Sequence, residues 1–409
     1  MSTRPFDRTV VIIAYLSFVV LGMPTALLGV VWSPHMRDAF ALSLDAVATL
    51  YFTTSCGYFA ASFVSGRLFA RHSIGLLLAA GSAMGALAFA GYALAPAWTL
   101  IVALGLVAGF GAGILDGGMN IYFAAHFDAR LMNWLHASFG IGSTLAPLLI
   151  NLVLAQQGSW RLGYWLVAVL YLAMAALFVL SRSRWLPLVS GVNTAGAHHT
   201  TASATLRLPA VWVGIAIFAL FAGLESATGQ WSKSIFAESR GVAETVASNW
   251  VALYWLSFTI GRIMFGFAAH RIPSRRLLRV SMVGALAGMA LLVWNPFATS
   301  GVVAVSLFGF MFGPIFAMLV TATQERLGGE HAANAIGFQV AAATIGIGLL
   351  PGALGMLGVA LGLESISVAL LVLVAAMAAL YAVWQRMSTG RREAVAADEP
   401  EPVAAKPGA

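Results

Sequence analysis

Charged residues are scarce in this chain. Lys, Arg, Asp and Glu make up 9% of the 409 residues, whereas apolar residues make up 60%. Because a soluble domain has roughly 25% charged residues, this composition excludes an ordinary soluble protein and indicates one with many membrane spans. The net charge of +7 would suggest a nucleic-acid partner in a soluble chain. Here the basic residues gather in short loops between apolar runs, so we expect a lipid bilayer and no nucleic acid as partner.

Cysteine and lysine are nearly absent. The single cysteine, Cys56, excludes an intrachain disulfide framework. Neither of the lysines, Lys233 and Lys406, follows a Gly-rich loop, so the chain has no P-loop through which ATP could drive it. The sequence also lacks HExxH, GxSxG and clustered Cys/His patterns. We therefore expect no enzyme activity, no metal site and no cofactor.

Long apolar runs are abundant. A helix needs about 20 apolar residues to cross a bilayer, and on this rule we expect an all-α membrane protein with twelve spans. The first run is too long for a cleavable signal peptide. The spans lie near residues 9–33, 46–69, 74–94, 98–126, 132–155, 160–181, 209–236, 244–269, 277–296, 299–324, 332–358 and 362–385.

A polar stretch divides these spans into two groups of six. Residues 182–208 are rich in Ser, Thr, Ala and Gly, which predicts a flexible linker. The linker separates an N-terminal half, residues 1–181, from a C-terminal half, residues 209–386. Residues 387–409 are charged and rich in Pro and Ala, so we expect a disordered tail.

The distribution of basic residues predicts the orientation. With the N-terminus placed in the cytoplasm, most loop arginines fall on the cytoplasmic side, where positive charge is normally in excess. The other side then has only Arg37, Arg161, Lys233 and Arg240. We expect both termini to be cytoplasmic, and the chain to be a monomer in the plasma membrane, the inner membrane if the cell is bacterial.

The two halves repeat a segment. The sequence from Asp45, DAVATLYFTTSCGYFAASFVSGRLFARHSIG, aligns with the sequence from Glu244, ETVASNWVALYWLSFTIGRIMFGFAAHRIPSRRL. Such a six-plus-six repeat is typical of transporters in which two halves rock around a site between them. Twelve spans, a central linker and a Gly-x-x-x-x-Arg loop after the second span of each half resemble the major facilitator superfamily.

The resemblance also assigns gating residues. Gly66 and Arg71 in the first half, and Arg262, Gly266 and Arg271 in the second, fit the loop motif of the superfamily. The acid that usually precedes its arginine is replaced by Ala70 and His270. Gating by an aspartate at these positions is therefore not expected.

Three segments carry a finer resemblance. They are LDGGMN at 115–120, NWLHASFGIGSTLAPLL at 133–149 and FAGLESATGQW at 221–231. Together they resemble the fucose permease-like branch, which includes proton-coupled sugar symporters. The first span, LGMPTALLG at 21–29, lacks the acid of the fucose permease pattern, so fucose itself is not implied.

Asp116 and Glu225 are the candidates for proton coupling. An acid inside a span is costly and is a functional hypothesis by default, because a carboxyl group in a low-dielectric site binds a proton more readily than one in water. The alternative for Asp116 is a packing hydrogen bond to Asn120, one turn along the helix, and for Glu225 a structural hydrogen bond. The resemblance implies that both acids face a central cavity.

Polar and aromatic residues in the spans are candidates for substrate binding. His136 either contacts substrate or proton, or fills a packing role. The others supply amide hydrogen bonds or an aromatic stacking surface, although Trp and Tyr also gather at membrane interfaces for physical reasons. The substrate-binding candidates are Asn120, His136, Gln230, Trp231, Asn249, Tyr254 and Gln339.

Several functions stay open. We expect a secondary active transporter that imports a small polar solute, such as a sugar, together with protons. An alternative is a proton-coupled exporter of amphipathic compounds, which a cavity lined by the Phe and Met residues of 308–318 would favour. Sodium is a second possible coupling ion, because Asp116, Asn120 and backbone carbonyls offer oxygen ligands. A non-transporting receptor is disfavoured by intact acids in both halves.

Overall fold

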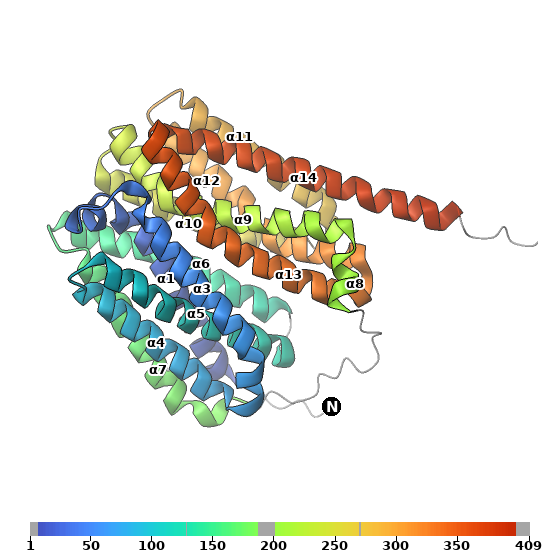
Figure 1. Ribbon diagram of the computed structural model, residues 1–409, viewed down its shortest axis with the longest axis horizontal. Coiled ribbons are helices and arrows are strands. Elements are labelled where there is room, and N and C mark those ends of the chain that lie inside the picture. Colours follow the sequence, from blue (N-terminus) through green and yellow to red (C-terminus); the bar gives the residue numbers. More distant parts are fainter. Residues whose placement is uncertain (1–6, 128, 187–200, 270, 398–409) are drawn as a thin grey trace, which may run out of the picture.

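The molecule is a bundle of long helices (Figure 1). The computed structural model describes residues 7–127, 129–186, 201–269 and 271–397, and these residues form no strand. Twelve helical segments in this part of the chain are long and apolar enough to cross a membrane. The expected all-α membrane fold with twelve spans is therefore confirmed.

The N-terminal half packs its helices in pairs. α3 lies against α5, α1 against α6, and α4 against α5 and α7. A short α2 (Arg37–Ala39) follows α1. The long helices are α1 (Arg8–Val31), α3 (Val47–Arg71), α4 (Ile74–Leu94), α5 (Trp98–His126), α6 (Ala129–Ala155) and α7 (Arg161–Leu180).

The C-terminal half repeats this arrangement. Its long helices are α9 (Pro209–Ser234), α10 (Glu244–Ala268), α11 (Ser274–Trp294), α12 (Ser300–Phe312), α13 (Ile315–Leu361) and α14 (Glu364–Ala397). α9 packs against α13, and α10 and α11 pack against α12. α13 carries the end of the span Ser300–Leu327 and the whole of the span His331–Leu361, so helical backbone continues where we expected a loop.

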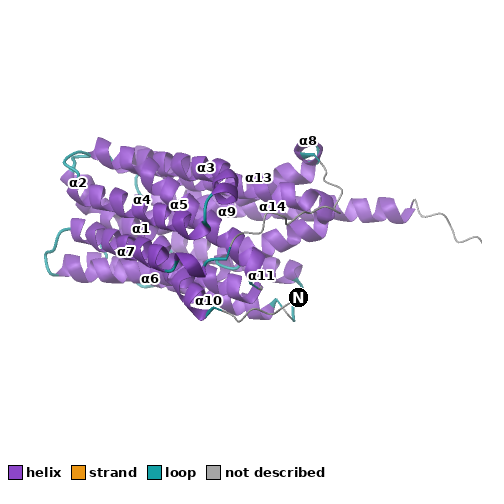
Figure 2. Cartoon of the chain, turned by 90° about the horizontal axis from the view of Figure 1, so that it is seen from below, coloured by secondary structure: helices purple, strands orange, loops and turns teal. Residues whose placement is uncertain are grey.

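The linker and the tail differ in part from the sequence prediction. Residues 187–200 of the linker lie outside the described residues, and α8 (Ala202–Leu206) occupies its last part. Residues 387–397 continue α14, where we expected disorder, and Figure 2 shows this helix projecting from the bundle. Ala, Arg and Glu in this stretch favour helix. Residues 398–409 lie outside the described residues.

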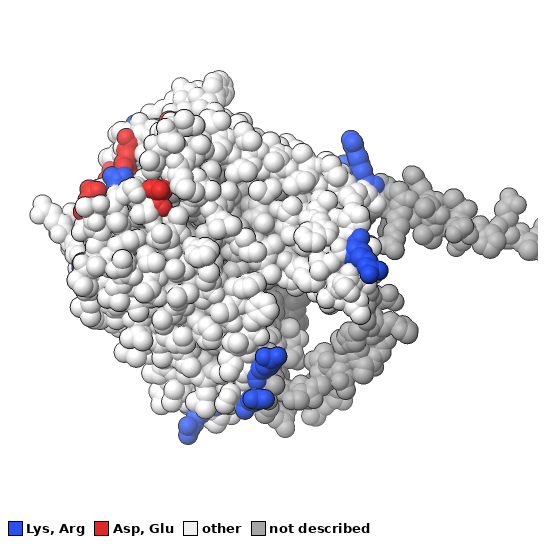
Figure 3. All heavy atoms as spheres, viewed as in Figure 1, with Lys and Arg blue, Asp and Glu red and all other residues white. Residues whose placement is uncertain are grey.

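The two ends of the bundle differ in charge. We name the end where α1 begins and α3 finishes the basic end, and the other the opposite end. Figure 3 shows Lys and Arg side chains without acids around the basic end, and acidic side chains gathered at the opposite end. Arg37 and Glu238 pair at the opposite end at 3.1 Å, and Arg240 pairs there with Glu364 at 2.8 Å.

Glycines bring the two halves together toward the opposite end. A Cβ added at Gly29 of α1 would lie 2.5 Å from the carbonyl oxygen of Gly229 of α9, and one added at Gly348 of α13 would lie 2.6 Å from Oγ of Ser55. Such close backbone approach requires residues without bulk. Nearer the basic end, a Cβ at Gly337 would meet no atom within 4 Å, and the surface is notched between the halves (Figure 3).

Candidate functional site

Asp116 accepts hydrogen bonds on both of its carboxylate oxygens. Tyr58 of α3 donates its hydroxyl to Oδ2, and Asn120, one turn along α5, donates Nδ2 to Oδ1 at 3.0 Å. The side chain of Asp116 is half-buried. The pairing of Asp116 with Asn120 on one helix face was predicted, whereas Tyr58 was not among the predicted residues.

His136 extends this network to a third helix. Its Nε2 lies 3.1 Å from Oδ1 of Asn120. Because the amide nitrogen of Asn120 is directed at Asp116, the amide oxygen must accept, and His136 must carry its proton on Nε2. The imidazole packs edge-on against Phe18 of α1, with ring centroids 5.6 Å apart. The predicted set of Asp116, Asn120 and His136 is thus assembled by α5 and α6, with α3 adding Tyr58.

Glu225 lies on α9 in different surroundings. The charged group that acts on its carboxylate electrostatically is Arg262 of α10. Arg262 also donates Nε to the carbonyl oxygen of Gly313 at 3.2 Å, and its guanidinium lies 4.8 Å from the ring centroid of Phe258. Tyr254 donates its hydroxyl to the backbone oxygen of Glu225 at 3.0 Å.

Arg262 is therefore not a loop residue. We placed it with the gating loops, but it lies inside α10 among membrane-embedded residues, where it interacts with Glu225. Gly66 and Arg71 lie in the last turns of α3, and Gly266 lies near the end of α10 with Arg271 in the following turn. These four residues do share the basic end. Gating by them stays a prediction.

The face of α9 that meets the N-terminal half is polar. Ser226 and Gln230 lie one turn apart on it, and both are buried. Tyr51 of α3 donates its hydroxyl to Oε1 of Gln230 at 3.1 Å. Nε2 of Gln230, Oγ of Ser226 and the indole nitrogen of Trp255 are buried without a hydrogen-bond partner. Buried donors are nearly always satisfied in native proteins, so these three atoms are candidates for contact with a polar molecule, and such contact stays a prediction.

Other predicted substrate residues have packing roles in this structure. Trp231 is fully buried and donates Nε1 to the carbonyl oxygen of Pro351 at 2.9 Å. Gln339 accepts a hydrogen bond from Thr323 at 3.1 Å. Asn249 accepts one from Asn151 across the halves at 2.9 Å, toward the opposite end. Substrate contact by Trp231, Asn249 and Gln339 stays a prediction, and the structure does not bring them together with Asp116.

A buried lysine closes the opposite end. The side chain of Lys233 is 0% exposed. It donates to the carbonyl oxygens of Val30 at 2.7 Å and Ser33 at 3.1 Å, and to Oε1 of Glu244 at 2.5 Å. Nε2 of His35 lies 2.6 Å from the same carboxylate oxygen. Because Val30 and Ser33 belong to the N-terminal half, this opposite-end cluster of Lys233, Glu244 and His35 joins the two halves.

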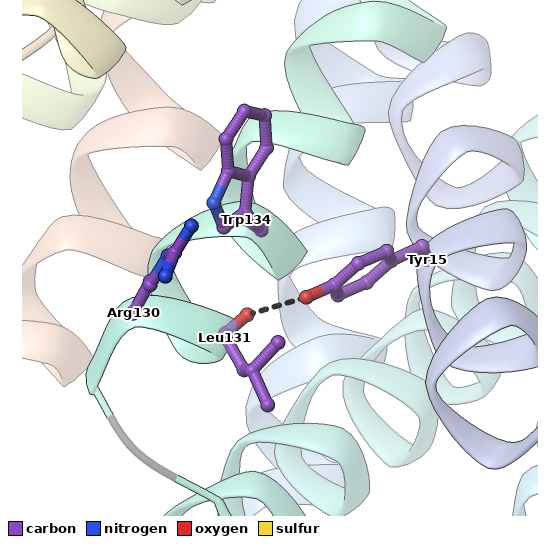
Figure 4. A pocket seen from close by; sticks show the side chains of 4 residues that line it. All are labelled: Tyr15, Arg130, Leu131 and Trp134. Carbon is purple, nitrogen blue, oxygen red and sulfur yellow. Dashed lines mark hydrogen bonds between the residues drawn. The ribbon is translucent and has the colours of Figure 1, made fainter. Parts of the chain in front are cut away.

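A hollow of about 430 Å³ lies near the basic end of α1 and α6. Tyr15, Arg130, Leu131 and Trp134 line it (Figure 4). The hydroxyl of Tyr15 donates to the carbonyl oxygen of Leu131 at 3.2 Å. This hollow does not include the acid network.

Two Phe residues of the segment 308–318 pack inside the bundle. Phe308 and Phe312 are fully buried, with their rings stacked at 4.4 Å, and Phe312 stacks on Phe221 of α9 at 4.7 Å. Their role here is to pack α9 against α12.

Comparison with known proteins identifies the family. The sequence matches the profile described as "Major Facilitator Superfamily" over residues 14–351, with a second match over 234–407. The chain belongs to this superfamily. Its members are transporters, which are not enzymes, and the resemblance that the sequence motifs suggested is confirmed.

Relatives within the superfamily are distant. One is "Bypass of stop codon protein 6" of Saccharomyces cerevisiae, which is 27% identical over 66% of this chain and 59% of its own length. Another is "Glucose/mannose transporter GlcP" of Bacillus subtilis, which is 24% identical over 61% of this chain and 63% of its own length. The matched region thus spans about three fifths of each of these relatives.

Solved structures of the superfamily share the fold. A D-xylose-proton symporter superposes with a TM-score of 0.74 at 14% identity, covering 92% of this chain and 98% of that one. A bacterial homologue of the human lysosomal transporter Spinster, described as inward-facing and unoccupied, gives a TM-score of 0.78 at 14% identity, covering 95% of this chain and 99% of that one. At these identities the likeness shows the fold alone.

Proposed function

We propose that this transporter imports a small hydroxylated solute, most simply a sugar, together with protons. The observation that carries the proposal is the half-buried carboxylate of Asp116, held by Tyr58 and Asn120 in the middle of an apolar span. A carboxylate inside an apolar span is energetically costly, which indicates a functional role. It can bind a proton at one side of the membrane and release it at the other.

Polar side chains on α9 and its neighbours support the proposal of a polar solute. Gln230 of α9 and Trp255 of α10 have N–H groups without a hydrogen-bond partner, and Tyr51 of α3 contributes a hydroxyl. Hydroxyl oxygens of a sugar are acceptors for such donors, and an aromatic ring such as Trp255 suits stacking against a sugar ring. The names of two similar proteins, a glucose/mannose transporter and a D-xylose-proton symporter, agree with this solute class.

The closed opposite end supports alternating access. If the basic end lies in the cytoplasm, as the excess of basic residues there favours, Lys233 and its partners close the side of the bundle that faces outward. Opening of this cluster and closing of the notch at the basic end then exposes the site to the outside. Both termini are cytoplasmic in this arrangement.

An exporter of amphipathic compounds has weaker support. The aromatic segment that would line its cavity is used in packing, since Phe308 and Phe312 are fully buried. Sodium coupling has weaker support as well, because within the described residues no cluster of three or more His, Cys, Asp and Glu side chains surrounds Asp116. Protons therefore remain the preferred coupling ion.

Transport by purified protein in liposomes tests the proposal. Labelled glucose, mannose, xylose and uridine are offered at an acidic outside pH, with a sodium gradient as a separate arm. We expect at least one sugar to accumulate when the pH gradient is imposed and a trapped pH dye to report proton entry with it. Accumulation driven by sodium alone, or loss of preloaded amphipathic dye with no sugar uptake, would contradict the proposal.

A further inference from the structure

Tyr58 is fixed against Asp116 by the packing of two helices. A Cβ added at Gly109 of α5 would lie 1.9 Å from the carbonyl oxygen of Thr54, and one added at Gly113 would lie 2.9 Å from the carbonyl oxygen of Tyr58. These glycines let α3 and α5 touch along their backbones. The hydroxyl of Tyr58 is thereby held on the carboxylate oxygen of Asp116 by the fold itself.

We propose that Tyr58 is a positioning residue that stabilises the deprotonated form of Asp116, and so favours release of the proton. The inference rests on the proposed function. A hydrogen bond to an ionised carboxylate is about twice as strong as one between neutral groups. The hydroxyl of Tyr58 therefore holds the carboxylate more tightly than it holds the protonated acid.

The second donor is oriented by His136. Nε2 of His136 lies 3.1 Å from the amide oxygen of Asn120, and an N–H on that ring nitrogen satisfies this oxygen while the amide nitrogen donates to Asp116. An amide turned the other way would place oxygen against oxygen. Both donors to Asp116 are thus supplied by neighbours that are themselves held in place.

Few other titratable groups face Asp116 from the helices packed against α5. α3 contributes Tyr58, and α6 contributes His136 through Asn120. α4 contributes only Tyr92, toward the opposite end, and α1 contributes Tyr15, which contacts Phe123 toward the basic end. Arg262 acts electrostatically on His136. Within the described residues, no cation is hydrogen-bonded to Asp116, so neutral donors control its charge.

Release of the proton from Asp116 breaks one covalent bond. The O–H bond of the Asp116 carboxyl breaks, its electron pair stays on the carboxylate, and the proton goes to water at the basic end. Tyr58 keeps its own proton throughout and only donates a hydrogen bond.

Infrared titration of the purified, full-length protein tests the inference without any substrate. The carboxyl band of Asp116 is assigned by subtracting the spectrum of Asp116→Asn. In Tyr58→Phe we expect the midpoint of this band to move up by about one pH unit, a tenfold change in proton affinity. The matched control is Tyr164→Phe, because the hydroxyl of Tyr164 is buried on α7 without a hydrogen-bond partner. Its midpoint should equal that of the wild type.

The outcomes separate this inference from the proposed function. An unchanged midpoint in folded Tyr58→Phe overturns the role of Tyr58. Absence of any titrating Asp116 band in the wild type overturns proton coupling through Asp116 as well. If Tyr58→Phe does not fold, fluorotyrosine incorporated into the wild type strengthens the donor and should move the midpoint down. No movement then rejects the inference.

Discussion

The two halves of this transporter surround their membrane acids differently. In the N-terminal half, Asp116 is held by neutral donors from Tyr58 and Asn120. In the C-terminal half, Glu225 faces the cation of Arg262. Protonation of Asp116 leaves no cation without a counter-charge, whereas protonation of Glu225 removes one of the attractions that act on Arg262, which also contacts Gly313 and Phe258. Neutral donors thus surround the acid of the N-terminal half, whereas a cation acts on the acid of the C-terminal half; that Asp116 carries the cycling proton stays a prediction.

The halves meet through both charged and neutral partners. The C-terminal half supplies the buried cation, Lys233, and the N-terminal half supplies the carbonyl oxygens of Val30 and Ser33. Backbone carbonyls near a helix end lack partners within the helix, so a lysine can satisfy them without a second acid in the N-terminal half. Separation of the halves leaves Lys233 with Glu244, its partner in the same half, and breaks the ion pair between Arg37 and Glu238.

Among the substitutions that test this difference between the halves, Asp116→Asn should have the largest effect on transport. The amide keeps the size of the side chain and much of its hydrogen bonding but cannot carry a proton. We expect substrate exchange without a gradient to persist and accumulation driven by a pH gradient to be lost. Counterflow and net uptake in the same liposomes measure the two. Accumulation equal to that of the wild type would show that Asp116 is not the coupling group.

Arg262→Gln is the corresponding substitution in the C-terminal half, where it tests the surroundings of Glu225. The change removes the hydrogen bond of the guanidinium to the carbonyl oxygen of Gly313 together with its attraction for Glu225, and a hydrogen bond to a charged group contributes roughly 1.5–3 kcal/mol. We expect a marked loss of thermal stability, with less additional loss when Glu225→Gln is added to the same chain. A double-mutant cycle on the melting temperature in detergent measures the coupling. Strict additivity of the two changes would mean that Glu225 and Arg262 act independently.

Lys233→Met tests whether the cation of the C-terminal half closes the opposite end. A hydrogen bond to a charged group contributes roughly 1.5–3 kcal/mol, so its loss should raise the open population about tenfold or more. We expect faster maleimide labelling of Ser33→Cys in a Cys56→Ser background. Lys406→Met, which changes the other lysine of the chain, is the control. Equal labelling rates in the Lys233 and Lys406 variants would exclude Lys233 as the closing group.

The sequence predicted the spans and the pair on a single helix, but not the partners between helices. Twelve apolar runs were sufficient for the fold, and four-residue spacing was sufficient to pair Asp116 with Asn120. Tyr58 lies on another helix, and its contact depends on the rotation of α3 that Gly109 and Gly113 permit. Arg262 was misplaced because its neighbour Gly266 fits a loop motif, although the helix continues to Ala268. Contacts of this kind follow from helix packing, which spacing along the chain does not determine.

Gly29→Ala gives the smallest expected effect and shows whether contact between the halves depends on shape as well as charge. The added methyl would lie 2.5 Å from the carbonyl oxygen of Gly229, so α1 and α9 must separate, at a cost of roughly 1–3 kcal/mol that small backbone shifts reduce. We expect slightly faster labelling of Ser33→Cys, with Gly337→Ala unchanged because its methyl meets open space. Lys233 and Gly29 act on the same surface. The two changes together should therefore increase the labelling rate by less than the sum of their separate effects. Without Lys233 the closed state is already less populated, so the added methyl group has less effect on it.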